Sequence, residues 1–310
     1  MFNKKGEITT QQIVLLIILI VSFIIILLLI VGFDFFAQSD KEICHNSVVM
    51  KSTTISEKAI PLDCSRTYIC ISEDGSCEGM TKPKIVKVET EEDIYSVLAE
   101  EMADCWWMFG EGKIDYVGKD FFTKDNYCSI CSQVGFDNSV KEIEGVGDEL
   151  SKDKLHAYLA KTKMPDEEIN YAEYFFGTND VEMLKRVKLK GEDGTEIVAG
   201  TFGTIDLDKQ HFVMMGITSE VSGLGWKIAA GVGLTVIGWW APPVWATWAG
   251  LISGALVVGA GMVGEGVSPE ITAITVEGDG IKNNFMAPTI QEANSNTLKK
   301  LDCYDILTSA

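Results

Sequence analysis

The apolar run from Ile13 to Phe33 constrains the fold more than any other feature of the sequence. It carries no charged residue, and only Ser22 and Gly32 depart from strong apolarity. About 20 apolar residues at a rise of ~1.5 Å each cover a ~30 Å hydrocarbon core. A helix buried in a soluble domain would normally keep a polar face, and this run has none. The run therefore predicts a transmembrane signal anchor over residues 13–33.

The charges on either side of the run predict its orientation. Lys4 and Lys5 precede the helix, whereas Asp34 and Asp40 follow it. Because basic residues are retained on the cytoplasmic side, we expect a protein of the cell membrane with residues 1–12 in the cytoplasm. The part of the chain after the anchor is then expected on the extracytoplasmic side.

The residues before the anchor also show a resemblance to a known type of leader. Lys4-Lys5-Gly6-Glu7, followed by polar residues and the apolar run, resembles the class III, prepilin-type signal segments of archaeal pilins and archaellins. The resemblance covers about 20 residues of the chain. It implies cleavage between Gly6 and Glu7 and packing of mature helices into a filament core. The alternative is a plain, uncleaved signal anchor. The composition of the rest resembles only uncharacterised archaeal membrane proteins.

All eight cysteines lie beyond the apolar run, and an even number in an extracytoplasmic domain predicts disulfides. The candidate disulfide cysteines are Cys44, Cys64, Cys70, Cys77, Cys105, Cys128, Cys131 and Cys303. We expect two local disulfides among the first four, and a long-range one from Cys303.

Cys128-Ser-Ile-Cys131 is the one redox-like motif. A catalytic C-x-x-C normally opens a helix, where the helix dipole lowers the pKa of the first thiol. This one lies in NYCSICSQVGF, which predicts a strand. A structural role is therefore favoured, with Cys105 as a partner for one of the two. A thiol oxidoreductase and a metal site remain alternatives.

Residues 34–222 predict an extracytoplasmic α+β domain with antiparallel strands and short helices. Residues 34–89 are expected to be irregular, with a hairpin around Asp74-Gly75. A helix is expected over residues 90–109, with a capping box of Thr90 and Asp93.

Shorter elements follow that helix in the predicted domain. Helices are expected after Ser151, with His156 on the helix surface, and from Pro165 to Gly177. The strands are expected at residues 187–190 and 195–198, as a hairpin, and at 200–207 and 211–218.

A second apolar region spans residues 223–266 and predicts a Gly-rich hydrophobic helical hairpin broken at Pro242-Pro243. Its small residues recur at helical spacing and suit close helix packing. These helix-packing candidates are Ala246, Gly250, Gly254, Ala260 and Gly264. The hairpin could pack within one subunit, drive oligomers, disturb a membrane, or lie buried in the domain. The C-terminal extracytoplasmic segment, 267–310, predicts a strand at 271–276 and a short helix at 297–307.

The net charge of −19 disfavours nucleic acid as a partner. No triad, metal or nucleotide motif is found, so we expect neither a catalytic residue nor a cofactor. The sequence predicts a membrane-anchored surface protein of structural or interaction type. A more specific form of this prediction is a pilin-like protein that assembles through its N-terminal helix. Its expected partners are the lipid bilayer and either a homo-oligomer or another surface protein. A pore-forming or fusion-like protein that uses residues 226–263 is the alternative, and a membrane-tethered thiol oxidoreductase that uses Cys128 and Cys131 is a further one.

Overall fold

The computed structural model divides the chain into two units, Met1–Ser39 and Asp40–Ala310. The structure describes residues 14–23, 39–53, 61–117, 126–165, 167–185, 188–190, 196–198, 200–218, 257–261, 270–277, 279, 281, 283–294, 298, 301 and 303–309.

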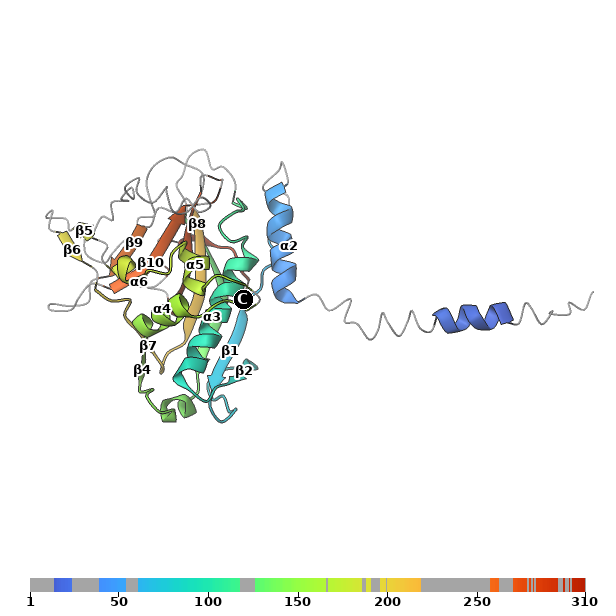
Figure 1. Ribbon diagram of the computed structural model, residues 1–310, viewed down its shortest axis with the longest axis horizontal. Helices are drawn as coiled ribbons and strands as arrows, with labels where there is room; N and C mark the ends of the chain where they lie inside the picture. Colours follow the sequence, from blue (N-terminus) through green and yellow to red (C-terminus); the bar gives the residue numbers. More distant parts are fainter. Residues whose placement is uncertain are drawn as a thin grey trace, which may run out of the picture. The chain divides into compact units, whose positions relative to one another are not determined.

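In the first unit, residues 14–23 form a helix (Figure 1). Its apolar side chains are exposed. The other residues of the predicted anchor lie outside the described residues, as do Gly6 and Glu7. Within the part of the chain that the structure describes, no helix combines the length and apolarity needed to cross a membrane.

The second unit alternates helices and strands. Its helices are α2 (Asp40–Thr53), α3 (Glu91–Met108), the 3₁₀ helix η1 (Asn138–Glu142), α4 (Lys152–Lys161), α5 (Tyr171–Phe176) and α6 (Val181–Lys185). Its first strands are β1 (Thr67–Ser72), β2 (Lys84–Lys87), β3 (Asn126–Phe136), β4 (Glu149–Ser151), β5 (Lys188–Lys190) and β6 (Glu196–Val198). The later strands are β7 (Thr204–Asp206), β8 (His211–Thr218), β9 (Val257–Gly261), β10 (Glu270–Glu277), β11 (Asn284–Glu292) and β12 (Cys303–Ile306).

Eight of the described strands form one mixed sheet in the order β2-β1-β3-β8-β11-β10-β9, with β12 paired to β3 beside this path. The pairs β1–β2, β1–β3 and β12–β3 are parallel, whereas β3, β8, β11, β10 and β9 alternate in direction. β12 lies along the start of β3 and β1 lies along its end, so the two share one edge of β3. The predicted α+β class is confirmed.

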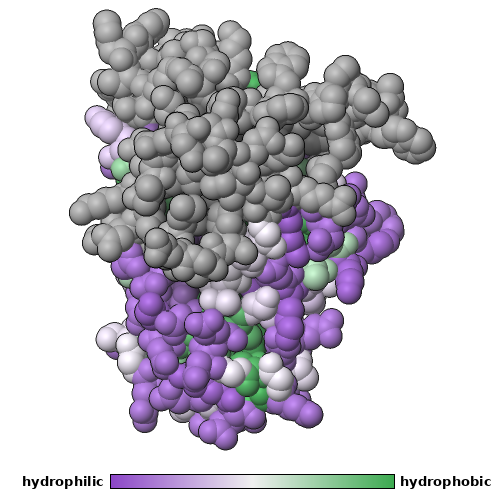
Figure 2. Space-filling model, turned by 90° about the vertical axis from the view of Figure 1, so that its left-hand side faces the viewer, coloured by the Kyte–Doolittle hydropathy of each residue, from purple (hydrophilic) through white to green (hydrophobic). Residues whose placement is uncertain are grey.

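The helices cover one face of the sheet. α3 crosses β3, β8 and β11, and α4 and α5 pack beside it (Figure 1). The main core lies between these helices and the sheet and includes Phe109, Phe175 and Phe285, each at most 1% exposed. A smaller apolar cluster draws on alternate positions of β3, Cys128 and Ile130, which point away from the α3 face. On the face that Figure 2 shows, the coloured part is mostly hydrophilic, with a narrow hydrophobic strip and a few smaller hydrophobic patches.

Local sequence explains why the confirmed elements form where they do. The Thr90 hydroxyl accepts from the Asp93 N–H at 3.1 Å, and the Asp93 carboxylate accepts from the Thr90 N–H at 2.8 Å, which completes the predicted capping box of α3. Ser151 caps α4 as expected. Gly177 ends α5 at φ 68°, a left-handed conformation that glycine adopts without strain. The predicted 187–198 hairpin is confirmed as β5–β6, and the expected strand at 271–276 as β10.

Four predictions of local structure outside the Gly-rich region are wrong. Residues 40–53 were expected to be irregular but form α2, whose acidic Asp40 and Glu42 and basic Lys51 suit the helix dipole. The strand before Asp74-Gly75 does not form a hairpin. The turn lies within a longer connection, and β2 therefore returns parallel to β1.

The third wrong prediction concerns α5, which begins at Tyr171 rather than at Pro165, because Lys163 and Asn170 form a β-bridge first. The expected C-terminal helix is also wrong, since residues 303–306 pair with β3 as β12. In this segment, pairing with β3 stabilises a strand more than the local sequence pattern stabilises a helix.

The predicted Gly-rich helical hairpin needs a correction at its end. Residues 257–261, which include the packing candidate Ala260, form β9 against β10 rather than part of a helix. Val257 and Val258 are β-branched and favour a strand once an edge is available. Residues 219–256 lie outside the described residues, together with Ala246, Gly250, Gly254 and Gly264.

Candidate functional site

All eight predicted cysteines are paired in four disulfides. The bonds are Cys44–Cys64, Cys70–Cys77, Cys105–Cys131 and Cys128–Cys303. The two local bonds, the partnership of Cys105 with one cysteine of the C-x-x-C motif, and the long-range bond of Cys303 are all as predicted. Several disulfides in one domain indicate an extracytoplasmic location.

The two cysteines of the C-x-x-C motif in β3, Cys128 and Cys131, form disulfides with two different elements. Cys131 bonds to Cys105 on α3, and Cys128 bonds to Cys303 on β12. The two sulfurs therefore leave the strand toward different elements, and both cysteines are almost fully buried, at 0% and 2% exposure. A thiol oxidoreductase needs the two cysteines to pair with each other and to be accessible. This geometry gives that alternative no support.

A polar cluster joins α2 to α3. Lys41 forms ion pairs with Glu101 and Asp104, and the ring of His45 stacks on Trp107 at 4.2 Å between centroids. Burial raises the pKa of the Glu101 carboxyl, although the ammonium of Lys41 opposes this effect. Together with Cys44–Cys64, these contacts fix α2 on the domain.

A second polar cluster joins the connection after β1 to the start of η1. Asp74 accepts hydrogen bonds from Ser72 and Ser76, and Asp137 accepts from Ser76 and Ser139. The Ser76 hydroxyl is the largest cause that lowers the pKa of Asp74 to about 2. Both carboxylates are thus already engaged by donors of the chain itself. No group of His, Cys, Asp and Glu among the described residues could hold a metal ion.

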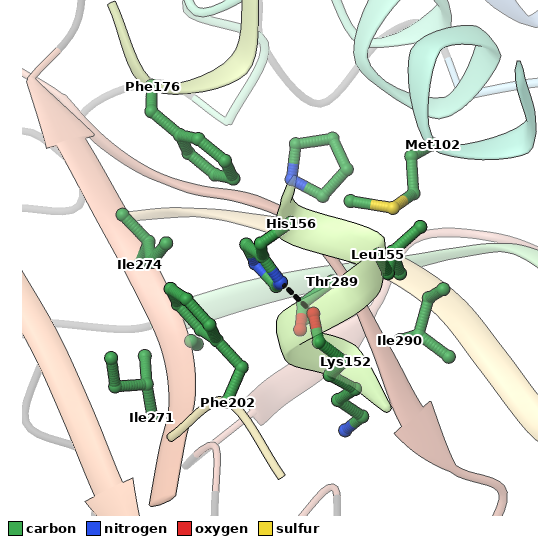
Figure 3. Close-up of a pocket in the computed structure, with 12 residues that line it drawn as sticks. Met102, Lys152, Leu155, His156, Phe176, Phe202, Ile271, Ile274, Thr289 and Ile290 are labelled. Atoms are coloured by element: carbon green, nitrogen blue, oxygen red, sulfur yellow. Dashed lines mark hydrogen bonds between the residues drawn. The ribbon is translucent and has the colours of Figure 1, made fainter. Parts of the chain in front are cut away.

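An aromatic pocket lies between the helices and the sheet (Figure 3). It encloses about 20 Å³, roughly the room that one water molecule requires. Its lining comes from α3, α4, α5, β10, β11 and the segment before β7. These residues are Met102, Lys152, Leu155, His156, Phe176, Phe202, Ile271, Ala273, Ile274, Pro288, Thr289 and Ile290.

His156 is the polar centre of this pocket. Its ring stacks on Phe202 at 3.6 Å between centroids with a 3° angle between planes, and on Phe176 at 6.0 Å (Figure 3). Its Nδ1 lies 2.7 Å from the carbonyl oxygen of Lys152, and because a carbonyl can only accept, Nδ1 carries the proton. Burial lowers the pKa of His156 to about 4, against the raising effect of that carbonyl.

The expectation that His156 lies on the helix surface is therefore wrong. Leu155 and Leu159 are the buried residues of α4, and His156 lies next to the first and one turn before the second. This position at the edge of the apolar stripe was the signal in the sequence.

The geometry of the pocket limits its chemistry. Among the residues that line it, Lys152 is the one other titratable group: its backbone carbonyl contacts the His156 ring, and its positive charge helps to lower the pKa of His156. A ligand site usually encloses a few hundred Å³, far more than this pocket holds. The arrangement can stabilise a neutral imidazole and seat a water molecule, and it acts as part of the core.

No family model, curated protein or solved structure matches this chain.

Proposed function

We propose that this chain is a membrane-anchored surface protein of structural or interaction type, with its α+β domain on the extracytoplasmic side. The observation that carries the proposal is the complete pairing of eight cysteines into four disulfides within one domain. Such a domain needs an oxidising compartment. The charge-free run over residues 13–33 supplies the means to hold it there.

The form of the domain supports a structural or interaction role. Two disulfides join the central strand β3 to α3 and to the final strand β12, and a third joins α2 to the segment before β1. The acidic, hydrophilic surface suits a domain that stays solvated beside a membrane (Figure 2). The pocket around His156 is lined by the domain's own side chains and leaves room for only about one water molecule.

A more specific form of this proposal is that the chain is a pilin-like protein. It rests on the resemblance of Lys4-Lys5-Gly6-Glu7 and the apolar run to prepilin-type leaders. In that version the chain is cut between Gly6 and Glu7 and assembles through its N-terminal helix.

The anchor is tested by charged substitutions and a matched apolar control. On insertion scales a lysine at the middle of a membrane helix costs about 2.5–3.5 kcal/mol, whereas each Leu, Ile, Val or Phe contributes about −0.3 to −0.6 kcal/mol, so about three lysines are needed to offset the run. We expect the full chain to stay in the membrane fraction after extraction with alkaline carbonate, the triple variant Ile20→Leu, Phe23→Leu and Ile26→Leu to behave identically, and the triple variant Ile20→Lys, Phe23→Lys and Ile26→Lys to be released. Release of the unmodified chain would contradict the anchor, and the intact mass of the retained protein tests cleavage after Gly6.

A further inference from the structure

The strand directions bring both ends of residues 219–256 to one end of the sheet. β8 ends at Thr218, and β9 begins at Val257. Because β8, β11, β10 and β9 alternate in direction, the end of β8 and the start of β9 face the same way. The chain thus leaves and re-enters the domain at one end, which we call the exit end.

Two tyrosines from other strands lie at the exit end. Tyr127 of β3 is in register with Ile217, one residue before β8 ends. Tyr304 of β12 precedes Asp305, which is in register with Tyr127. The two rings meet edge to face with centroids 5.9 Å apart, and Tyr304 is 68% exposed. The disulfide Cys128–Cys303 holds β12 on β3 and so fixes this pair.

The sequence that starts and finishes at this end is apolar. No charged residue occurs between Lys227 and Glu265, and Pro242-Pro243 divides the stretch. Thr218 and Val257, the described residues that flank this stretch, both lie at the exit end. A long sequence without charge favours an apolar environment such as the bilayer over water.

We propose that the exit end, marked by Tyr127 and Tyr304, is the face of the domain that contacts the lipid bilayer. Tyrosine is enriched at membrane interfaces because its ring is apolar and its hydroxyl can stay hydrated. The exposed Asp279 and Asp305 lie near this end. The contact therefore lies at headgroup level and does not depend on anionic lipid. This inference rests on the proposed membrane anchor and adds the orientation of the domain.

Photocrosslinking in the native membrane tests the orientation. A benzophenone amino acid replaces Tyr304 in the full chain, and the matched control carries it at Ile85. Ile85 is an exposed apolar residue of β2, in register with Cys70, which pairs with Gly135 near the opposite end of β3. The membranes are irradiated, washed with alkaline carbonate, and analysed for adducts by mass spectrometry.

In protein that carbonate does not extract, we expect lipid adducts when the benzophenone is at position 304 and no lipid adducts when it is at position 85. Lipid adducts at both positions, at position 85 alone, or at neither would overturn the orientation while leaving the anchor intact. Adducts to a second copy of the chain at position 304 would assign the exit end to self-association instead. Protein extracted by carbonate would overturn both the anchor and the orientation.

Discussion

The two halves of the main sheet are stabilised in different ways. All eight cysteines belong to the half formed by β1, β3, β12 and the neighbouring α2 and α3, or to the connections beside them. The other half, β8, β11, β10 and β9, contains no cysteine. It depends on strand pairing and on the aromatic core around Phe202, Phe285 and His156.

The difference follows the connectivity of the chain. β12 reaches β3 from a distant part of the sequence, so its pairing carries a large loop-closure cost, which the disulfide Cys128–Cys303 between these two strands offsets. β8, β11 and β10 are antiparallel neighbours with continuous registers apart from one break in each β11–β8 and β10–β9 pair. The break in β11 contains Pro288, which has no N–H to give to the ladder. Packing rather than cross-linking holds this half.

Removal of the long-range disulfide should have the largest effect. Cys128→Ala with Cys303→Ala frees a loop with a sequence separation of 175, and the chain-entropy estimate for such a loop is about 5 kcal/mol in the free energy of unfolding. The control, Cys70→Ala with Cys77→Ala, frees a separation of only 7 and should cost about 2.5 kcal/mol. Urea unfolding followed by circular dichroism measures both. Equal losses would mean that loop length does not govern the cross-linked half.

In the half without cysteines, the largest loss should come from the aromatic core. Phe202 is 2% exposed and stacks on His156, so Phe202→Ala should cost about 3–5 kcal/mol in the free energy of unfolding. Met50→Ala, at a side chain that is 56% exposed, is the control and should stay within about 0.5 kcal/mol. A loss below about 1 kcal/mol for Phe202→Ala would show that packing does not hold this half.

Acid should weaken the same half through its histidines. The pKa values of His156 and His211 both fall to about 4 in the folded protein, mainly through burial, against 6.5 in the unfolded chain. The unfolded state then binds protons that the folded state does not, so stability is full above pH ~6.5 and falls toward pH ~4. Each histidine contributes at most about 1.4 kcal/mol per pH unit, or about 3 kcal/mol across this interval.

The matched variant for this pH dependence is His156→Phe, which keeps an aromatic ring against Phe202. Its unfolding free energy should fall less steeply between pH 6.5 and 4 than that of the unmodified chain. An unchanged slope in a urea titration at several pH values would show that His156 accepts its proton in the folded state.

The smallest effect should come from the cap of α3, which lies across both halves. Thr90→Ala removes the hydroxyl that accepts from the Asp93 N–H and should cost about 1 kcal/mol. Ser96→Ala, within the same helix, should be neutral or slightly stabilising because alanine is the better helix former. Equal effects of the two substitutions in thermal unfolding would contradict the role of the cap.

Local chemistry made much of the fold predictable. Thr90 with Asp93, Ser151 and Gly177 are short-range signals, and each has its expected role in the structure. Pairing of Cys105 with the C-x-x-C motif was also predictable, because a helix stripe and a buried strand must meet in the core.

Long-range pairing was the part that local sequence could not predict. β12 replaced an expected helix because β3 offered an open edge beside Tyr127, and β9 replaced part of an expected helical arm because β10 offered another. The pocket around His156 was missed because Phe176 and Phe202 reach it from separate segments of the chain.

The central claim, an extracytoplasmic domain held by four disulfides, is tested most directly by the intact mass of the natively expressed protein after alkylation. The account predicts no alkylation before reduction and eight adducts after it, with proteolytic fragments linked as Cys44–Cys64, Cys70–Cys77, Cys105–Cys131 and Cys128–Cys303. Alkylation of Cys128 and Cys131 without reduction would contradict it, because the two cysteines that connect β3 to α3 and β12 would then be free thiols.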